Sequence, residues 1–240
     1  MAFVAPNAEV DCTPHESRKE ACLVDMEAMR CISDKKSKLL DFALESADGI
    51  GMVCGGKVKI FLEPIEGTPV LYVFGDGHIA VPLVQFAKTL EFDVVVVDDR
   101  EEFANKNRFP LANEVKLGDF GSVVKSIDFR EGDSVVIITR GHQHDEVVLK
   151  ECLSKDGLPG YVGMIGSKEK IAATFSHLRQ QGISEQLLAI VRAPIGLDIG
   201  ARSPAEIALS IMAEIVAQRY GKIAKQSETT FRKKEVVSSS

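Results

Sequence analysis

The stretch most suited to chemistry is the glycine turn Gly75-Asp76-Gly77-His78, which follows an apolar run and precedes Ala80. Gly75 permits a tight turn, and Gly77 lets the backbone approach a phosphate with no Cβ in the way. The helix that starts here offers free N–H groups and a partial positive charge to an anion. We therefore predict that Gly75, Gly77 and His78 bind a phosphorylated ligand, while the motif by itself specifies no reaction.

Two acidic residues stand where dinucleotide-binding domains place a ribose-binding acid. Asp98 and Asp99 end a valine-rich run, about 20 residues after the glycine turn. A carboxylate at this position binds a ribose diol and favours NAD over NADP, because an acid repels a 2′-phosphate. Arg100 follows directly and weakens that preference, and all three residues are cofactor-binding candidates.

A third group is the run Arg140-Gly141-His142-Gln143-His144-Asp145, which comes directly after an apolar run at 133–139. In doubly wound sheets ligands bind beyond the carboxyl ends of the strands, so this run and the glycine turn are expected at one edge. Histidine, arginine and aspartate there can bind phosphate, transfer protons or ligate a metal. We assign Arg140 and Gly141 to ligand binding, and His142 and Asp145 to catalytic or orienting roles. For Asp145 the alternative is an N-cap of the helix that runs to Cys152.

Gly166 and Ser167 end another apolar run, at 160–167, and are further cofactor-binding candidates. Ser167 is predicted to cap a helix that runs to about Gln181. The start of this helix, with Lys168 and Lys170, is a possible second anion site. A satisfied cap with solvated lysines explains the same pattern equally well.

The chain has five cysteines, with scattered spacings and no C-x-x-C pair. Neither a disulfide framework nor a zinc site is indicated, and we predict no metal site. Cys54 stands directly before Gly55-Gly56, where backbone N–H groups can lower the pKa of a thiol. On spacing alone, a small apolar residue before a turn is the better interpretation of Cys54.

The elements that position these residues alternate between strand and helix. Apolar runs predict strands at 70–74, 93–99, 114–117, 133–139 and 160–167, joined by helices at 80–90, 122–127, 145–152 and 167–181. A further extended run is expected at 187–192, and Ser203-Pro204-Ala205-Glu206 starts a last helix with a serine cap. This order predicts an α/β fold with a Rossmann-like, doubly wound parallel sheet.

A small α+β piece is expected before the sheet, with a helix at 16–32, a strand at 39–44 and a hairpin around Gly55-Gly56. The run 63–69 contains two prolines and a glycine and is typical of a linker. The predicted domains are residues 1–66, a Rossmann-like domain at 67–221, and a polar tail at 222–240 that we expect to be disordered.

Composition narrows the function classes. The net charge of -6 argues against a non-specific nucleic-acid binder. No apolar run is long enough for a membrane span, and the first residues lack the basic and apolar regions of a secretory leader. We therefore expect a cytoplasmic protein with no nucleic-acid or membrane partner.

Several of these runs, in this order, resemble the XdhC/CoxI family of accessory proteins for molybdenum hydroxylases such as xanthine dehydrogenase. The runs are Gly75-Asp76-Gly77-His78, Asp99-Arg100 with 102–105 and Arg108-Phe109-Pro110, Arg140-Gly141-His142 with Asp145, 163–167, and 194–200 with the Ser203-Pro204 helix. The resemblance covers residues from about 50 to about 220.

The resemblance implies a protein that binds the molybdenum cofactor (molybdopterin), assists its sulfuration and delivers it to a molybdenum hydroxylase. A cysteine desulfurase is then a second partner, and we expect a homodimer that acts as a maturation chaperone rather than a free-standing enzyme. It also implies that Cys54, in the run Met52-Val53-Cys54-Gly55-Gly56, matches the family's Cys-Gly-Gly run. A soft thiolate suits contact with sulfur or molybdenum.

The N-terminal part differs from the family pattern. Family members usually have a longer N-terminal domain with earlier glycine-rich segments, and none of these occurs before Gly49. Residues 1–66 thus resemble a shortened or diverged version. Two alternatives remain open: an NAD(P)-dependent oxidoreductase, and a nucleotide-sensing Rossmann regulatory module.

Overall fold

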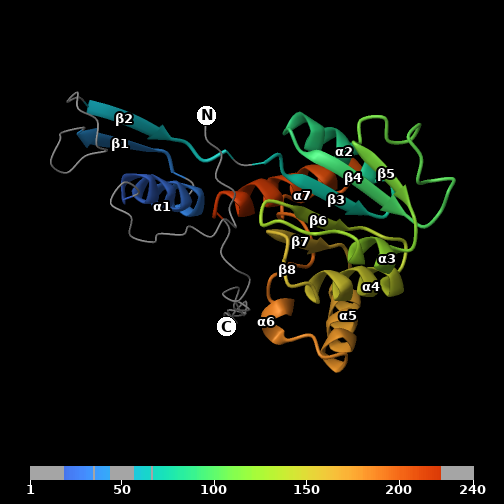
Figure 1. Ribbon diagram of the computed structural model, residues 1–240. Coiled ribbons are helices and arrows are strands. Elements are labelled where there is room, and N and C mark those ends of the chain that lie inside the picture. The colour runs from blue at the N-terminus through green and yellow to red at the C-terminus, as the bar shows by residue number, and fades with distance from the viewer. Residues whose placement is uncertain (1–18, 35, 44–56, 66, 223–240) are drawn as a thin grey trace, which may run out of the picture. The chain divides into compact units, whose positions relative to one another are not determined.

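The computed structural model describes residues 19–34, 36–43, 57–65 and 67–222 (Figure 1). The chain divides into two compact units, Met1–Gly67 and Thr68–Ser240. None of the described helices has the length and apolar character needed to cross a membrane.

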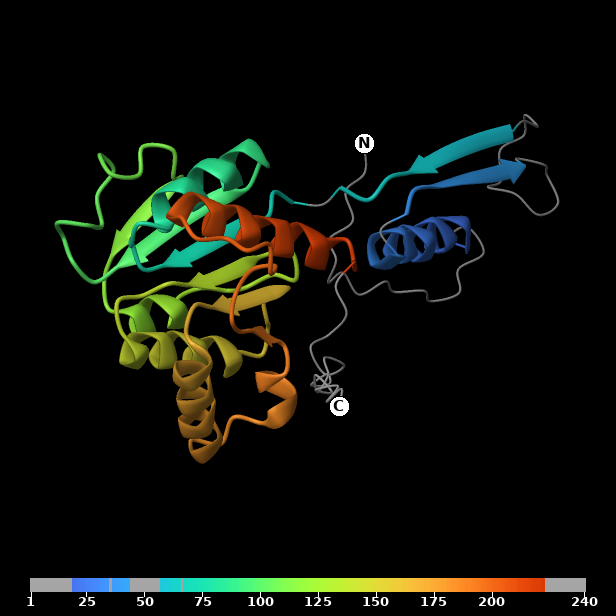
Figure 2. The same cartoon turned by 180° about the vertical axis from the view of Figure 1, so that it is seen from behind.

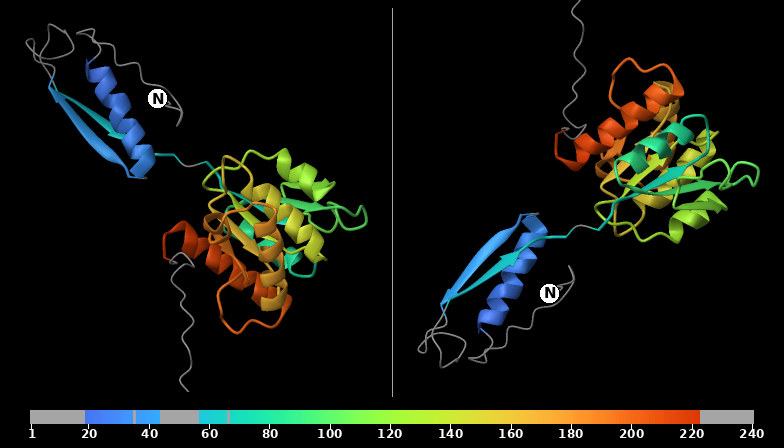
Figure 3. Two further views of the ribbon diagram at one scale, coloured as in Figure 1. Left: turned by 90° about the horizontal axis from the view of Figure 1, so that it is seen from below. Right: turned by 90° about the horizontal axis from the view of Figure 1, so that it is seen from above.

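The N-terminal unit is a helix on a two-stranded sheet. α1 (Lys19–Asp34) lies along β1 (Lys38–Ala43) and β2 (Lys57–Leu62), which pair antiparallel with Leu40 opposite Ile60 (Figure 3). These elements give this unit the α+β character predicted from the sequence.

A buried carboxylate ties α1 to the sheet. Glu27 accepts a hydrogen bond from Arg30 at 2.8 Å and another from Lys38, the first residue of β1. The extended run predicted before Gly55-Gly56 lies outside the described residues, and so does Cys54. Among the described residues, the partner of β2 is β1.

Six parallel strands form the central sheet of the second unit, in the order β5-β4-β3-β6-β7-β8. The strands are β3 (Val70–Phe74), β4 (Asp93–Asp98), β5 (Glu114–Leu117), β6 (Ser134–Ile137), β7 (Tyr161–Met164) and β8 (Val191–Arg192). The order runs outward in both directions from β3 and β6, which is the doubly wound arrangement. The predicted Rossmann-like fold is confirmed.

Helices cover both faces of this sheet (Figures 1 and 2). They are α2 (Ala80–Thr89), α3 (Phe120–Lys125), α4 (His142–Leu153), α5 (Lys168–Gln180), α6 (Glu185–Leu188) and α7 (Pro204–Arg219). Alternate strand residues serve the two cores: Val73 and Val96 pack with α2 and α7, whereas Phe74 and Val97 pack with α3 and α4. A fully buried side chain of this size contributes about 1.5–3 kcal/mol. The strand ends that carry the polar loops are therefore held firmly.

One predicted element is wrong. The run at 187–192 is not extended throughout, because Ser184 caps the short helix α6 by accepting a hydrogen bond from the Leu187 N–H. Only Val191 and Arg192 join the sheet. The capping box of the last helix is confirmed, with Ser203 and Glu206 bonding each other's backbone.

Candidate functional site

The glycine turn and the loop after β6 lie against each other at the point where the strand order reverses. Gly75 has a φ of +99°, and a Cβ placed there would lie 2.5 Å from the carbonyl oxygen of Ile138. Both the backbone conformation and the close approach require glycine. Two loops that are far apart in the sequence thus meet between β3 and β6, where Rossmann domains bind their ligands.

The helices that start at this point lack side-chain caps. Ile79 precedes α2 and Gly141 precedes α4, and neither residue has a side-chain oxygen that could accept a hydrogen bond from its helix. The other helices of this unit, α3, α5, α6 and α7, each have a side-chain oxygen that caps their first turn. These oxygens belong to Asp119, Ser167, Ser184 and Ser203, respectively. Uncapped N–H groups at two neighbouring helix starts are suited to an anionic ligand.

The turn itself leaves room for a ligand. Gly77 is exposed, and a Cβ added there would meet no atom within 4 Å. His78 is also exposed and stands just before α2. Both residues are accessible, as the predicted phosphate contacts require.

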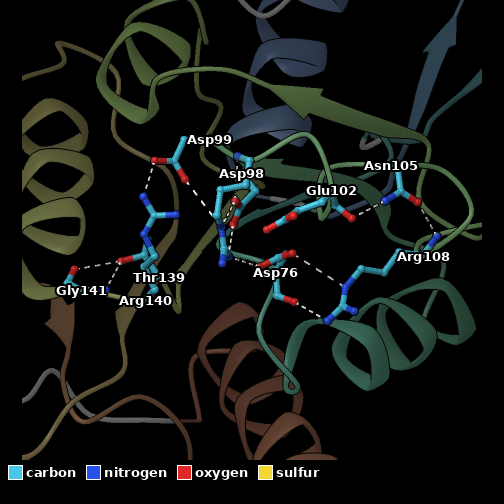
Figure 4. A network of polar contacts seen from close by, with 10 residues as sticks. Asp76, Asp98, Asp99, Glu102, Asn105, Arg108, Thr139, Arg140 and Gly141 are labelled. Atoms are coloured by element: carbon cyan, nitrogen blue, oxygen red, sulfur yellow. Dashed lines mark hydrogen bonds and ion pairs between the residues drawn. The ribbon is translucent and has the colours of Figure 1, made fainter.

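Asp76, between the two glycines, belongs to a buried network that the sequence pattern did not reveal (Figure 4). Arg100 donates from Nη2 to Asp76 Oδ1 at 2.6 Å and from Nε to Asp98 Oδ1 at 2.9 Å. Arg108 donates to the backbone carbonyl of Asp76 at 2.8 Å. Both aspartates are only 2% exposed. The signal that could have revealed the network is an acid enclosed by glycines, followed by two arginines in an irregular segment.

The two carboxyl groups differ in their affinity for protons. Burial and the nearby Asp98 carboxylate raise the pKa of Asp76 to about 6, although Arg100 and Arg108 act in the opposite direction. Burial also opposes ionisation of Asp98, but hydrogen bonds from Arg100 hold the pKa of Asp98 below its usual value. Asp98 thus carries the negative charge, while Asp76 titrates in mildly acidic solution.

Asp98 and Asp99 occupy different environments. Arg100 binds both oxygens of Asp98 through its side chain, with Nη2 at 3.3 Å from Oδ2. Asp99 is more exposed and accepts a hydrogen bond from Arg140 Nη2 at 2.9 Å (Figure 4). This bond joins the loop after β4 to the loop after β6. The sequence predicts a ribose-binding role for either aspartate. Asp99 suits this role better, because Asp98 is buried and bound by Arg100.

The N-cap interpretation of Asp145 is wrong, because α4 already begins at His142 and Asp145 lies in its first turn. The Asp145 side chain is fully buried. Thr139 donates its hydroxyl to Asp145 Oδ1 at 2.5 Å, and Lys170 Nζ lies 2.5 Å from Oδ2. Asp145 therefore positions its neighbours. It does not face a ligand directly.

The two histidines of this loop point in different directions. His142 is exposed and lines a pocket, whereas the His144 ring packs edge to face against Phe120, with 5.4 Å between ring centroids. Among the described residues no cluster of three or more His, Cys, Asp or Glu side chains could hold a metal ion.

The pocket lies between α4 and α5 and has a volume of about 440 Å³. It is lined by Arg140, Gly141, His142, Glu146, Lys170, Ala173, Thr174 and His177. It includes three of the predicted site residues, but the glycine turn, Gly166 and Ser167 do not line it. Ser167 is the N-cap of α5 and accepts a hydrogen bond from the Lys170 N–H at 3.2 Å. The predicted cap is thus present.

Comparison with known proteins decides the family. A sequence model of the XdhC Rossmann domain matches residues 71–215, which is more than half of the chain. The chain belongs to the XdhC family. The resemblance inferred from the glycine, arginine and aspartate runs is therefore confirmed.

Two curated relatives extend this XdhC assignment. The uncharacterized protein YqeB of Escherichia coli (strain K12) is 31% identical over 193 residues, covering 79% of this chain and 35% of YqeB. A Bacillus subtilis (strain 168) protein named as a probable xanthine dehydrogenase subunit is 30% identical over 161 residues, covering 67% of this chain and 46% of that protein. The chain thus spans less than half the length of either relative.

A solved structure supports the fold of this XdhC protein. A protein from Bacillus halodurans described as a xanthine dehydrogenase superposes with a TM-score of 0.57 at 20% sequence identity. The match covers 87% of this chain and 83% of that one. At this identity the likeness concerns the architecture alone.

Proposed function

We propose that this XdhC protein binds the molybdenum cofactor and assists its sulfuration and its insertion into a molybdenum hydroxylase such as xanthine dehydrogenase. The family supplies the link to these enzymes, and one relative is named as a probable xanthine dehydrogenase subunit. The observation that carries the binding step is the meeting of two uncapped helix starts at the reversal of the strand order.

The residues at this edge fit a phosphorylated ligand. The open space over Gly77 admits a phosphate to the start of α2, and the start of α4 likewise has no side-chain cap. Arg140 and Arg100 supply positive charge, and Asp99 retains an oxygen, Oδ1, without a hydrogen-bond partner among the described residues. Guanidinium groups and amide N–H groups are the usual partners of phosphate in proteins.

Four of the predicted site residues then have a role in holding the ligand. Gly75 and Gly77 shape the phosphate turn, Asp99 binds a sugar hydroxyl where the ligand carries one, and His142 orients polar groups from the loop after β6. The cofactor, when bound, supplies the molybdenum chemistry that the hydroxylase uses. Cys54 is proposed as the contact for sulfur or molybdenum, since a thiolate is a soft ligand.

The proposal includes the assembly in which the protein works. A molybdenum hydroxylase receives the cofactor, and a cysteine desulfurase supplies the sulfur. We propose that the chain forms a homodimer in the cytoplasm. Size-exclusion chromatography with light scattering measures the assembly directly.

The test is to purify the full chain without oxygen and to measure its pterin and molybdenum content, and its uptake of added cofactor. Gly77→Val places a branched side chain in the space over the turn and is expected to reduce uptake at least tenfold. Gly132→Val is the matched control, since a Cβ at Gly132 also meets no atom within 4 Å. A protein that neither contains nor takes up the cofactor contradicts the proposal.

NAD(P) is the second candidate ligand, because this strand order is that of dinucleotide-binding Rossmann domains. Titration with NAD and ATP, followed by a hydride-transfer assay, distinguishes the cases. Nucleotide binding without pterin uptake favours a regulatory module, and turnover favours an oxidoreductase.

A further inference from the structure

We propose that the pocket between α4 and α5 binds a phosphate carried on an organic group of nucleotide size. Its volume of about 440 Å³ lies within the range of small-molecule sites. The inference rests on the proposed function for the identity of the ligand and deepens it. A second phosphate compartment beside the glycine turn favours the dinucleotide form of the pterin cofactor over its short form.

A fixed cation forms one wall of the pocket. Lys170 Nζ lies 2.5 Å from Asp145 Oδ2, and the Asp145 side chain is fully buried. The Thr139 hydroxyl holds the other oxygen of Asp145. Because an ammonium group has three N–H donors, at least two remain for a ligand beside the ion pair with Asp145. The buried carboxylate therefore holds the lysine in place at the pocket wall.

The remaining lining presents donors rather than free carboxylates. Its one acid, Glu146, is occupied: His177 Nδ1 lies 3.2 Å from Oε2, and Gln181 donates to Oε1 at 2.6 Å. Arg140 has five N–H donors and uses Nη2 on Asp99. The lining thus holds two cationic side chains, Arg140 and Lys170, against one acid, Glu146. Their chemistry suits an oxyanion.

Apolar and small surfaces complete the pocket. Ala173 and the buried Thr174 lie on the α5 side, with Gly141 on the α4 side. These short side chains leave the space into which the organic part of the ligand fits. The pocket is therefore suited to a phosphate ester rather than to a bare ion.

The structure shows that two lysines with the same role in the sequence pattern have different environments. Lys168 is exposed and does not line the pocket, whereas Lys170 is half-buried and does. Both lie in the first turn of α5. Lys168 is thus a matched control that carries the same charge on the same helix.

The experiment is isothermal titration of the full chain with AMP, CMP, inorganic phosphate and the nucleosides adenosine and cytidine. A nucleoside monophosphate is expected to bind at least tenfold more tightly than its nucleoside and than inorganic phosphate. Lys170→Met should weaken this binding at least tenfold, and Lys168→Met should change it less than twofold.

A second pair of variants leaves the ion pair intact, because Lys170→Met deprives the buried Asp145 of its partner and can unfold the protein. Ala173→Phe fills the pocket, and Ala172→Phe adds the same ring at an exposed neighbour that does not line it. Loss of nucleotide binding in Ala173→Phe alone supports the pocket.

Three results overturn the inference: no phosphate compound binds, nucleosides bind as tightly as their phosphates, or the paired variants behave alike. Cofactor uptake separates this inference from the proposed function. Undiminished uptake in Ala173→Phe contradicts the pocket and leaves the function standing. Nucleotide binding that depends on Ala173, with no cofactor uptake, supports the pocket and contradicts the function.

Discussion

Two buried aspartates at opposite ends of the central strands differ in how fully their oxygens are bonded. Asp133, just before β6, is 1% exposed and accepts hydrogen bonds from the backbone N–H groups of Val70 at 3.2 Å and Arg130 at 2.9 Å. The Arg130 side chain adds a bond from Nη2 at 3.0 Å. Asp76, just after β3, is 2% exposed, yet its Oδ2 has no hydrogen-bond partner among the described residues.

The difference matches the different functions of the two ends of a parallel sheet. At the amino end, Asp133 joins the starts of β3 and β6 and has both oxygens bonded. At the carboxyl end, where ligands bind, Asp76 keeps an incompletely bonded carboxyl group with a raised pKa. Proteins commonly leave buried polar groups without complete hydrogen bonding at functional sites. The comparison thus identifies Asp76 as a functional candidate and Asp133 as a structural one.

The largest effect is expected from Asp133→Asn. Both oxygens of Asp133 accept N–H groups, so an amide NH2 necessarily faces a donor and leaves buried groups unsatisfied. We expect a loss of about 2–3 kcal/mol in the free energy of unfolding, measured by urea denaturation. Asp76→Asn is the matched variant: Oδ1 still accepts from Arg100, and the NH2 replaces an oxygen that has no hydrogen bond and only a long ion pair, 3.8 Å from Arg108 Nε. A loss below about 1 kcal/mol is expected there, and equal losses would remove the distinction.

A pH-dependent difference of intermediate size is expected from Asp76. Because the pKa of Asp76 is raised in the folded state from 3.8 to about 6, its contribution to stability is present below pH 4 and is lost as the pH rises through 6. Between pH 4.5 and 7 the wild-type protein should therefore lose about 1–2 kcal/mol relative to Asp76→Asn. Urea midpoints at several pH values measure this, and parallel curves for the two proteins contradict it.

The smallest effect concerns the bond between Asp99 and Arg140. The Arg140 side chain is 45% exposed, so Asp99→Asn should change the free energy of unfolding by less than about 0.5 kcal/mol. Releasing the guanidinium should, however, tighten binding of a phosphate ligand by about two- to fivefold. Glu102→Gln removes an equal charge from the same loop without touching Arg140. Equal tightening in both variants would attribute the effect to net charge alone.

The sequence is sufficient for those features that depend on neighbouring residues. The turn at Gly75, the valine-rich β4 and the Ser203-Pro204 capping box each follow from local rules about φ, hydrophobicity and hydrogen bonding. Together they predict the alternation of strands and helices. The doubly wound order then follows from the fold class.

The partners of the buried charged side chains could not be predicted from local sequence rules. Asp98 matches the position of a ribose-binding acid, but an arginine two residues later binds it and reaches Asp76, 24 residues away in sequence. Likewise, Asp145 and Lys170 meet only because α4 and α5 pack together. Such pairs depend on tertiary packing, which periodicity and spacing do not encode. Local patterns therefore indicate which residues stand at the strand ends, but not which partners bind their side chains.

The contact at Gly75 has a mechanical consequence. Ile138 and Thr139 stand so near that a Cβ at position 75 would meet the backbone of both, at 2.5–2.8 Å. The turn therefore abuts the strand end that leads to Arg140. A ligand that moves the turn toward Ile138 would press on this backbone, and Arg140 also lines the pocket between α4 and α5.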